Sequence, residues 1–155
     1  MGATIIEKIL AAHADGLVKP GDIIDLRIDA RAARDFGGAN VVRNLRLADL
    51  PIADASRTFF TFDCNPGGSD QKYAANQQIC RVFGQEHGIY VYDLPSGIGT
   101  HVAIEEGLVG PGGTLVSTDS HANIMGAIGA FGQGMGDADI AAAFATVAFV
   151  AFISL

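Results

Sequence analysis

Residues 69–94 read SDQKYAANQQICRVFGQEHGIYVYDL, a polar segment with helical spacing that leads straight into a strand-like run. The spacing predicts a helix that Ser69 caps at its N-terminus and Gly88 ends. The run IYVYDL at 89–94 then follows at once as a strand, because aromatic and β-branched residues favour extended backbone. The predicted inward stripe of the helix consists of Tyr73, Ile79, Val82 and Phe83.

The same alternation extends outward in both directions. Strands are predicted at 23–29, 57–63 and 114–119, and helices at 4–14, 37–50, 121–132 and from about 137 onward, where Asp137 or Asp139 caps the last helix. Alternating strands and helices indicate a parallel sheet with helices on both faces. The sequence therefore predicts a three-layer α/β/α fold with a mostly parallel sheet.

Length and composition narrow the class of protein. The chain has 155 residues, 49% of them hydrophobic and 17% charged, which is typical of one globular domain. Its net charge of −7 argues against a nucleic-acid partner, since phosphate binding needs a basic face. Small acids remain possible ligands, because arginines or helix N-termini bind anions locally. Residues 1–16 show no secretory signal, so we expect a cytoplasmic protein.

The last stretch, 140–155, reads IAAAFATVAFVAFISL without a single charge. These 16 residues fall short of the roughly 20 that a membrane-spanning helix needs, so a buried helix is predicted and no membrane partner is expected. The stretch has no capping glycine or terminal lysine or arginine. We expect a domain over 1–146 and an atypical apolar tail over 147–155, the point where a longer protein is truncated.

Polar residues follow two of the predicted strands. Asp119 and His121 leave a strand two residues apart, so in extended backbone they point the same way. A carboxylate beside an imidazole suits acid–base catalysis, and the alternative is a strand-end turn in which Asp119 caps the next helix. His101 lies in a glycine-flanked loop, where it is either structural or functional. The glycines of 126–136 lie too late in the chain for a dinucleotide-binding loop.

The two cysteines, Cys64 and Cys80, form neither a CxxC nor a zinc pattern, and no metal ligands are assigned from spacing. Reduced thiols of a cytosolic protein are one interpretation, and a reactive Cys64 that follows Asp63 is the other.

Three segments together, 1–29, 75–121 and 125–146, resemble the aconitase family, within it the N-terminal domain of 3-isopropylmalate dehydratase large subunits. The specific signal is the joint occurrence of GIGTH at 97–101, EEGLVGPG at 105–112 and TDSH at 118–121. This resemblance implies a hydro-lyase that dehydrates and rehydrates a small hydroxy-acid at a [4Fe-4S] cluster, and a place in leucine biosynthesis. One iron of the cluster acts as a Lewis acid.

The resemblance also implies roles for particular residues. His101, Asp119 and His121 would be catalytic, with His101 paired to Asp119 and His121 paired to an acid outside this chain. Asp63 and Ser120 would bind substrate. The cysteines that hold the cluster, the cluster-binding domains and a swivelling small subunit would all lie outside residues 1–155.

Two positions depart from the family pattern. Asp63-Cys64-Asn65-Pro66 stands where the family has Asp-His-x-x-Pro, and Arg34-Asp35-Phe36-Gly37 stands where it often has His-Asp-x-Thr. We expect the isolated chain to be inactive. The alternatives are a non-catalytic remnant or interaction module of the same fold, and a thiol enzyme that uses Cys64, which an ordinary thiol pKa would exclude.

Overall fold

The computed structural model describes residues 2–67 and 69–153 of the chain. Its α-helices are α1 (Ile5–His13), α2 (Gly38–Leu47), α3 (Gln71–His87), α4 (Gly99–Glu105) and α5 (Asp137–Thr146), joined by the 3-10 helices η1 (Ala55–Arg57), η2 (Leu94–Ser96) and η3 (Ser120–Ile128). Its strands are β1 (Ile23–Arg27), β2 (Ala30–Arg34), β3 (Thr58–Thr61), β4 (Tyr90–Tyr92), β5 (Thr114–Ser117), β6 (Phe131–Gly134) and β7 (Ala148–Phe152). In the described part of the chain, every helix is too short or too polar to cross a membrane.

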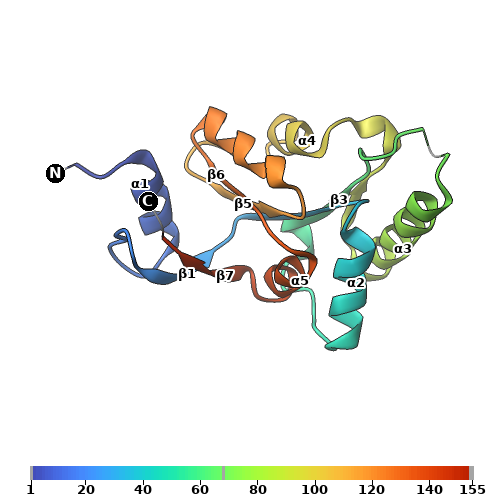
Figure 1. Cartoon of the computed structure of the whole chain (residues 1–155), viewed down its shortest axis with the longest axis horizontal. Helices are drawn as coiled ribbons and strands as arrows, with labels where there is room; N and C mark the ends of the chain where they lie inside the picture. The colour runs from blue at the N-terminus through green and yellow to red at the C-terminus, as the bar shows by residue number, and fades with distance from the viewer. Residues whose placement is uncertain (1, 68, 154–155) are drawn as a thin grey trace.

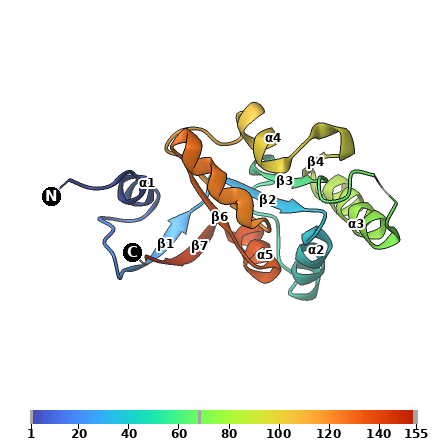
Figure 2. The ribbon, with the colours of Figure 1, turned by 45° about the horizontal axis from the view of Figure 1, so that its top comes forward.

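Five strands form one parallel sheet in the order β4-β3-β2-β5-β6. Helices α2, α3 and α5 cover one face of this sheet, and α4 and η3 cover the other (Figure 1). The predicted three-layer α/β/α fold is therefore confirmed. Two strands, β1 and β7, form a separate antiparallel ribbon at the end of the molecule that also carries α1 (Figure 2).

Side-chain alternation along the strands builds a separate core on each face of the sheet. Phe60 of β3 points into the core under α2, α3 and α5, where its ring packs edge-on against Phe83 at 6.5 Å and Phe144 at 6.0 Å. Its neighbour Phe59 points to the other face and packs against Tyr92 at 5.7 Å. Both faces of the central strands are thus buried, as expected of a parallel sheet.

Helix α3 lies where the sequence predicts it, but its details differ. Asp70, not Ser69, caps it by accepting hydrogen bonds from the amides of Lys72 and Tyr73. The predicted stripe is wrong at Ile79 and Val82, each 39% exposed, because the buried face holds Gln77, Cys80, Phe83 and Gly84. Gly88 ends the helix in the left-handed conformation, φ 69°, as predicted.

Two strands of the sheet were not predicted. Strand β2 reads ARAAR, a composition with weak strand preference, yet it lies at the centre because neighbours cover both its faces. Strand β6 lies inside the stretch predicted as a glycine-studded helix. A Cβ atom at Gly132 would overlap the carbonyl oxygen of Ala122, and one at Gly134 would lie 2.6 Å from the Ser120 Cα. Glycine is therefore required where β6 passes against η3.

The predicted long C-terminal helix is also wrong. Helix α5 ends at Thr146, Val147 adopts the left-handed conformation with φ 56°, and the following apolar residues form β7. Strand β7 pairs antiparallel with β1, with Arg27 opposite Ala148. Neither Asp137 nor Asp139 caps α5, which begins after Gly136. Asp137 instead accepts a hydrogen bond from the Asn40 side-chain amide at 2.8 Å.

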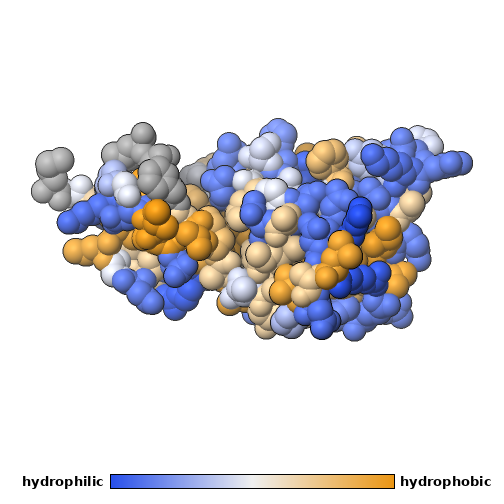
Figure 3. Space-filling view, turned by 60° about the horizontal axis from the view of Figure 1, so that its bottom comes forward, coloured by the Kyte–Doolittle hydropathy of each residue, from blue (hydrophilic) through white to orange (hydrophobic). Residues whose placement is uncertain are grey.

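The β1–β7 ribbon exposes apolar side chains: Ile23 is 71% exposed and Val150 is 66% exposed. Figure 3 shows hydrophobic residues gathered at this end of the molecule. A groove of about 880 Å³ runs beside the ribbon, lined mostly by apolar residues of α1, β6, α5 and β7.

Candidate active site at the carboxyl edge of the sheet

The carboxyl ends of β2, β3 and β5 lie side by side, since Arg34 is in register with Thr61 and Ala32 with Ser117. The polar residues that follow these strands therefore meet at one edge of the sheet, where ligands bind in open α/β folds. Arg34 ends β2, Asp63 follows β3, and Asp119 follows β5.

His121 and Asp119 form a hydrogen-bonded pair. The ring Nδ1 of His121 lies 2.8 Å from Asp119 Oδ1, which also accepts the His121 backbone amide at 3.2 Å. The His121 side chain is 81% exposed, whereas that of Asp119 is 7% exposed. Asp119 caps η3, as the turn interpretation predicts, and the same carboxylate also bonds to the imidazole.

Burial by itself raises the pKa of Asp119. The hydrogen bonds from His121 and the positive charges of Arg34 and His121 act in the opposite sense and hold this pKa below its ordinary value. Asp119 is therefore a carboxylate at neutral pH. A carboxylate accepts only, so Nδ1 of His121 carries the proton that it shares with Asp119, and Nε2 is left for other partners.

Arg34 links this pair to the next strand. Its Nη1 lies 2.8 Å from Asp119 Oδ2 and its Nε lies 2.7 Å from Asp63 Oδ1. Burial lowers the pKa of Arg34, but Asp63 and Asp119 raise it above its ordinary value, so the guanidinium stays charged. By resemblance to the family, Arg34 marks only the loss of a histidine. Its position at a strand end between two acidic strand ends was the signal for a bridging role.

Asp63 continues the chain of contacts to α4. Its second oxygen accepts the Gly99 backbone amide at 2.7 Å, at the first turn of the helix that carries His101. Both oxygens of Asp63 are thus engaged, and its side chain is 5% exposed. The predicted role of Asp63 in substrate binding is therefore not supported by the geometry, because a buried carboxylate with both oxygens bonded positions its neighbours.

The predicted pairing of the histidines is also wrong. Arg34 and His121 occupy the two oxygens of Asp119, so His101 does not bond to it, and His121 finds its acidic partner within this chain. His101 is exposed on α4, and Ser120 is exposed at the start of η3. Helices α4 and η3 pack side by side on the same face of the sheet, which places both residues above the same core.

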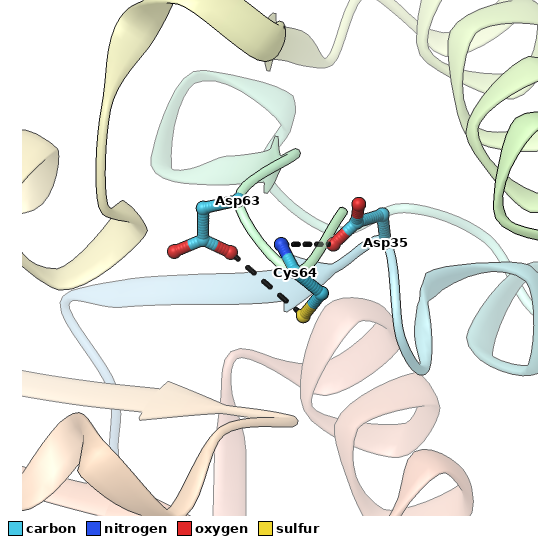
Figure 4. Close-up of side chains that lie close together, drawn as sticks. All are labelled: Asp35, Asp63 and Cys64. Carbon is cyan, nitrogen blue, oxygen red and sulfur yellow. Dashed lines mark hydrogen bonds between the residues drawn. The ribbon is translucent and has the colours of Figure 1, made fainter. Parts of the chain in front are cut away.

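A second acidic group, Asp35, lies deeper at the same edge. Its Oδ1 accepts the Cys64 amide at 3.1 Å and its Oδ2 accepts the Gln77 side-chain amide at 2.9 Å. Figure 4 shows Cys64 between Asp35 and Asp63, with its thiol 3.9 Å from Asp63. One ligand atom from each of these three residues falls within 4.8 Å of the others. The carboxylate oxygens of Asp35 and Asp63 already accept hydrogen bonds from Arg34, Gln77 and backbone amides.

The thiols do not suit the [4Fe-4S] cluster that the family resemblance implies. Such clusters are held by several cysteine thiolates, and the chain has two cysteines. Burial, followed by the carboxylates of Asp35 and Asp63, raises the pKa of Cys64 to about 12 against the opposite effect of Arg34. Burial and Asp35 raise that of Cys80 to about 12 as well. Both thiols stay protonated at neutral pH, which also argues against the thiol enzyme.

These features define a class of protein: an α/β/α domain with a histidine–carboxylate pair at the carboxyl edge of its sheet. The profile of the aconitase family (aconitate hydratase) matches residues 7–151, and the chain belongs to that family.

Relatives within the family include large subunits of two enzymes. The chain is 38% identical to the 3-isopropylmalate dehydratase large subunit of Moorella thermoacetica, over 94% of this chain and 36% of that protein. It is 34% identical to the homoaconitase large subunit of Thermus thermophilus, over 94% of this chain and 35% of that protein. The chain thus spans about a third of the length of these curated relatives.

Proposed function

We propose that this chain supplies the histidine–carboxylate acid–base pair of an aconitase-family hydro-lyase that removes water from a small hydroxy-acid and adds it back. The observation that carries this proposal is the contact of His121 Nδ1 with Asp119 Oδ1, on an exposed imidazole at the carboxyl edge of the sheet. The match of residues 7–151 to the family supports it.

The proposed chemistry of His121 is proton transfer at oxygen. In dehydration, the C–O bond of the substrate breaks and its electron pair leaves with the oxygen. The protonated imidazole donates its Nε2 proton to this oxygen, which departs as water. In hydration, Nε2 accepts a proton from water as the new C–O bond forms. Asp119 stabilises the imidazolium and holds its orientation throughout.

Other residues have supporting roles in this proposal. Arg34 holds Asp119 and Asp63 in place, and Asp63 fixes the first turn of α4 through the Gly99 amide. His101 on α4 and Ser120 at the start of η3 are both exposed, and we propose that they contact the substrate through their polar atoms.

The remaining chemistry is proposed to lie outside residues 1–155. This chemistry includes the removal of the carbon-bound proton. The cysteines that hold a [4Fe-4S] cluster and a swivelling small subunit are also proposed to lie outside this chain. The substrate is proposed to be an isopropylmalate-type hydroxy-acid of leucine biosynthesis, since relatives at 31–38% identity include 3-isopropylmalate dehydratase large subunits.

A chimera tests the proposal. Residues 7–151 would replace the matching segment of the Moorella thermoacetica large subunit, and turnover of isopropylmalate would be followed through the absorbance of the unsaturated product. We expect turnover that His121→Ala lowers by about 10²–10⁴-fold, the usual worth of a positioned acid–base group. The reversions Arg34→His and Cys64→His would be made alongside. A folded chimera that shows no turnover, or shows it only after both reversions, would contradict the proposal.

One observation favours a second candidate, a non-catalytic module of the same fold. Arg34 bonds to one oxygen of Asp63 and to one of Asp119. This arginine stands at a position where the family often has a histidine. If turnover appears only after Arg34→His and Cys64→His, the chain has kept the fold of a hydro-lyase and lost its chemistry.

A further inference from the structure

A polar cavity of about 560 Å³ lies at the opposite edge of the sheet from the candidate active site. It adjoins the amino ends of the parallel strands, next to Asp29 before β2 and the turn before Thr114 of β5. Arg27 at the end of β1 and Arg57 at the end of η1 contribute to its walls. The cavity therefore shares no residue with the site around Asp119.

Positive charge is concentrated here in an acidic chain. Three of the ten lysines and arginines line the cavity, namely Arg27, Arg31 and Arg57, whereas the whole chain carries −7. In the described residues, Arg27 and Arg57 form no ion pair with a carboxylate. Each is exposed and donates one long hydrogen bond to a backbone carbonyl, Arg27 to Ala12 at 3.2 Å and Arg57 to Leu108 at 3.3 Å. Their other N–H groups are free to meet a ligand.

The third arginine, Arg31, is 1% exposed and sits behind the other two. It donates to Thr58 Oγ1 and to the carbonyls of Ile28 and Asp54 at 3.0–3.2 Å, and its one carboxylate contact, with Asp54, is 3.8 Å long. Burial lowers its pKa, and the nearby charge of Arg57 lowers it further against the opposite effects of Asp54 and Asp29. This cation is therefore incompletely neutralised.

Two acidic residues also line the cavity, and other groups engage both. Asp29 Oδ2 accepts the Thr114 amide at 2.9 Å and contacts His13 Nε2 at 2.8 Å. Asp54 Oδ1 accepts the amide and hydroxyl of Ser56. The other ring nitrogen of His13 lies 2.9 Å from the Ile9 carbonyl oxygen, and the lining holds three arginines against these two carboxylates. The positive groups therefore outnumber the negative ones.

Glycines on one wall of the cavity leave room for a ligand. Gly107 and Gly110 lie in the loop between α4 and β5, and a Cβ atom at either position would meet nothing within 4 Å. The loop therefore adds no side chain to the cavity at these two positions, while Leu108 and Val109 of the same loop also line it.

We propose that this cavity binds a small oxyanion with carboxylate or phosphate groups, held by the guanidinium groups of Arg27 and Arg57. Planar guanidinium groups bind such oxygens through charge-assisted hydrogen bonds, and Arg31 adds a fixed positive charge behind them. The two chemical sources of such an anion are a dicarboxylate and inorganic phosphate.

Isothermal titration of the purified chain with malonate and, separately, with inorganic phosphate tests the proposal at constant ionic strength set by sodium chloride. We expect saturable binding of at least one of them. Arg27→Gln and Arg57→Gln should each weaken it about tenfold, the loss expected for one charge-assisted hydrogen bond. Arg43→Gln, on an exposed arginine of α2 outside the cavity, is the matched control and should leave binding unchanged.

Preference for malonate identifies a dicarboxylate site, and preference for phosphate identifies a phosphate site. The proposal is overturned if neither anion binds saturably, or if Arg43→Gln weakens binding as much as Arg57→Gln does. Thermal unfolding provides a second readout, because a ligand that binds only the folded state raises Tm. The binding anion should raise the Tm of Arg43→Gln as much as that of the unmodified chain, and raise that of Arg57→Gln less.

Discussion

Arg34 and Asp119 form an ion pair across the carboxyl edge of the sheet, with Nη1 2.8 Å from Oδ2, and the same guanidinium reaches Asp63 at 2.7 Å. Two largely buried carboxylates, Asp63 and Asp119, thus share one guanidinium group as an ion-pair partner. This relationship joins β2, β3 and β5 at the place where the proposed chemistry occurs.

Removing that cation should destabilise the fold. Arg34→Met leaves Asp63 buried without a counter-charge and leaves Asp119 with His121 alone, and we expect the free energy of unfolding to fall by about 3 kcal/mol in urea denaturation. Arg46→Met is the matched control, since Arg46 pairs with Glu86 at 3.0 Å on the surface and should cost less than about 1 kcal/mol. Equal effects of the two substitutions would show that the Arg34 bridge contributes no more than a surface pair.

Acid should weaken the protein in part through Asp119. Its folded-state pKa lies below its ordinary value, so the folded state binds fewer protons than the unfolded state near that value. The resulting stability is present above about pH 4 and is lost as the pH falls through the folded-state pKa. Urea midpoints measured from about pH 6 to pH 2 should fall less steeply for Asp119→Asn than for the unmodified chain.

Part of the acid dependence will remain in that variant. The Ser56 side chain lowers the pKa of Asp54, and Arg81 lowers that of Asp93, against burial in each case. Asp15→Asn, at an exposed position, makes the same charge change as a control. If Asp119→Asn leaves the slope as steep as Asp15→Asn does, the carboxylate of Asp119 is not stabilised in the folded state.

Cys64 should be an unreactive thiol. With its pKa raised to about 12, iodoacetamide at pH 8 should alkylate it on the order of a thousandfold more slowly than in the urea-unfolded chain, where the thiol pKa is about 8.5. Peptide mapping by mass spectrometry separates Cys64 from the fully buried Cys80. A rate for Cys64 that matches the unfolded chain would restore the thiol-enzyme hypothesis.

Gly132 should not tolerate a side chain. In Gly132→Ala the new Cβ would overlap the Ala122 carbonyl oxygen and lie 3.0 Å from Met125 Cβ, and we expect a loss of about 2–3 kcal/mol in thermal or urea unfolding. Gly126→Ala is the control on η3, where a Cβ meets nothing within 4 Å and the effect should stay within about 1 kcal/mol. A Gly132 variant as stable as the Gly126 variant would place β6 farther from η3.

The sequence by itself determined the local features of this protein. Alternating apolar segments predicted the three-layer α/β/α class, Gly88 predicted the end of α3, and the two-residue spacing of Asp119 and His121 predicted that their side chains point the same way. These features depend on residues that are neighbours in the chain, so backbone geometry alone brings them together.

Only the tertiary structure decided the rest. Strand β2 has weak strand preference and forms because β3 and β5 flank it, and the apolar tail becomes β7 because β1 offers an edge to pair with. The bridge from Arg34 to Asp63 and Asp119 joins residues far apart in the sequence, as does the cavity between Arg27 and Arg57. Such contacts depend on how the chain packs, which periodicity and spacing do not encode.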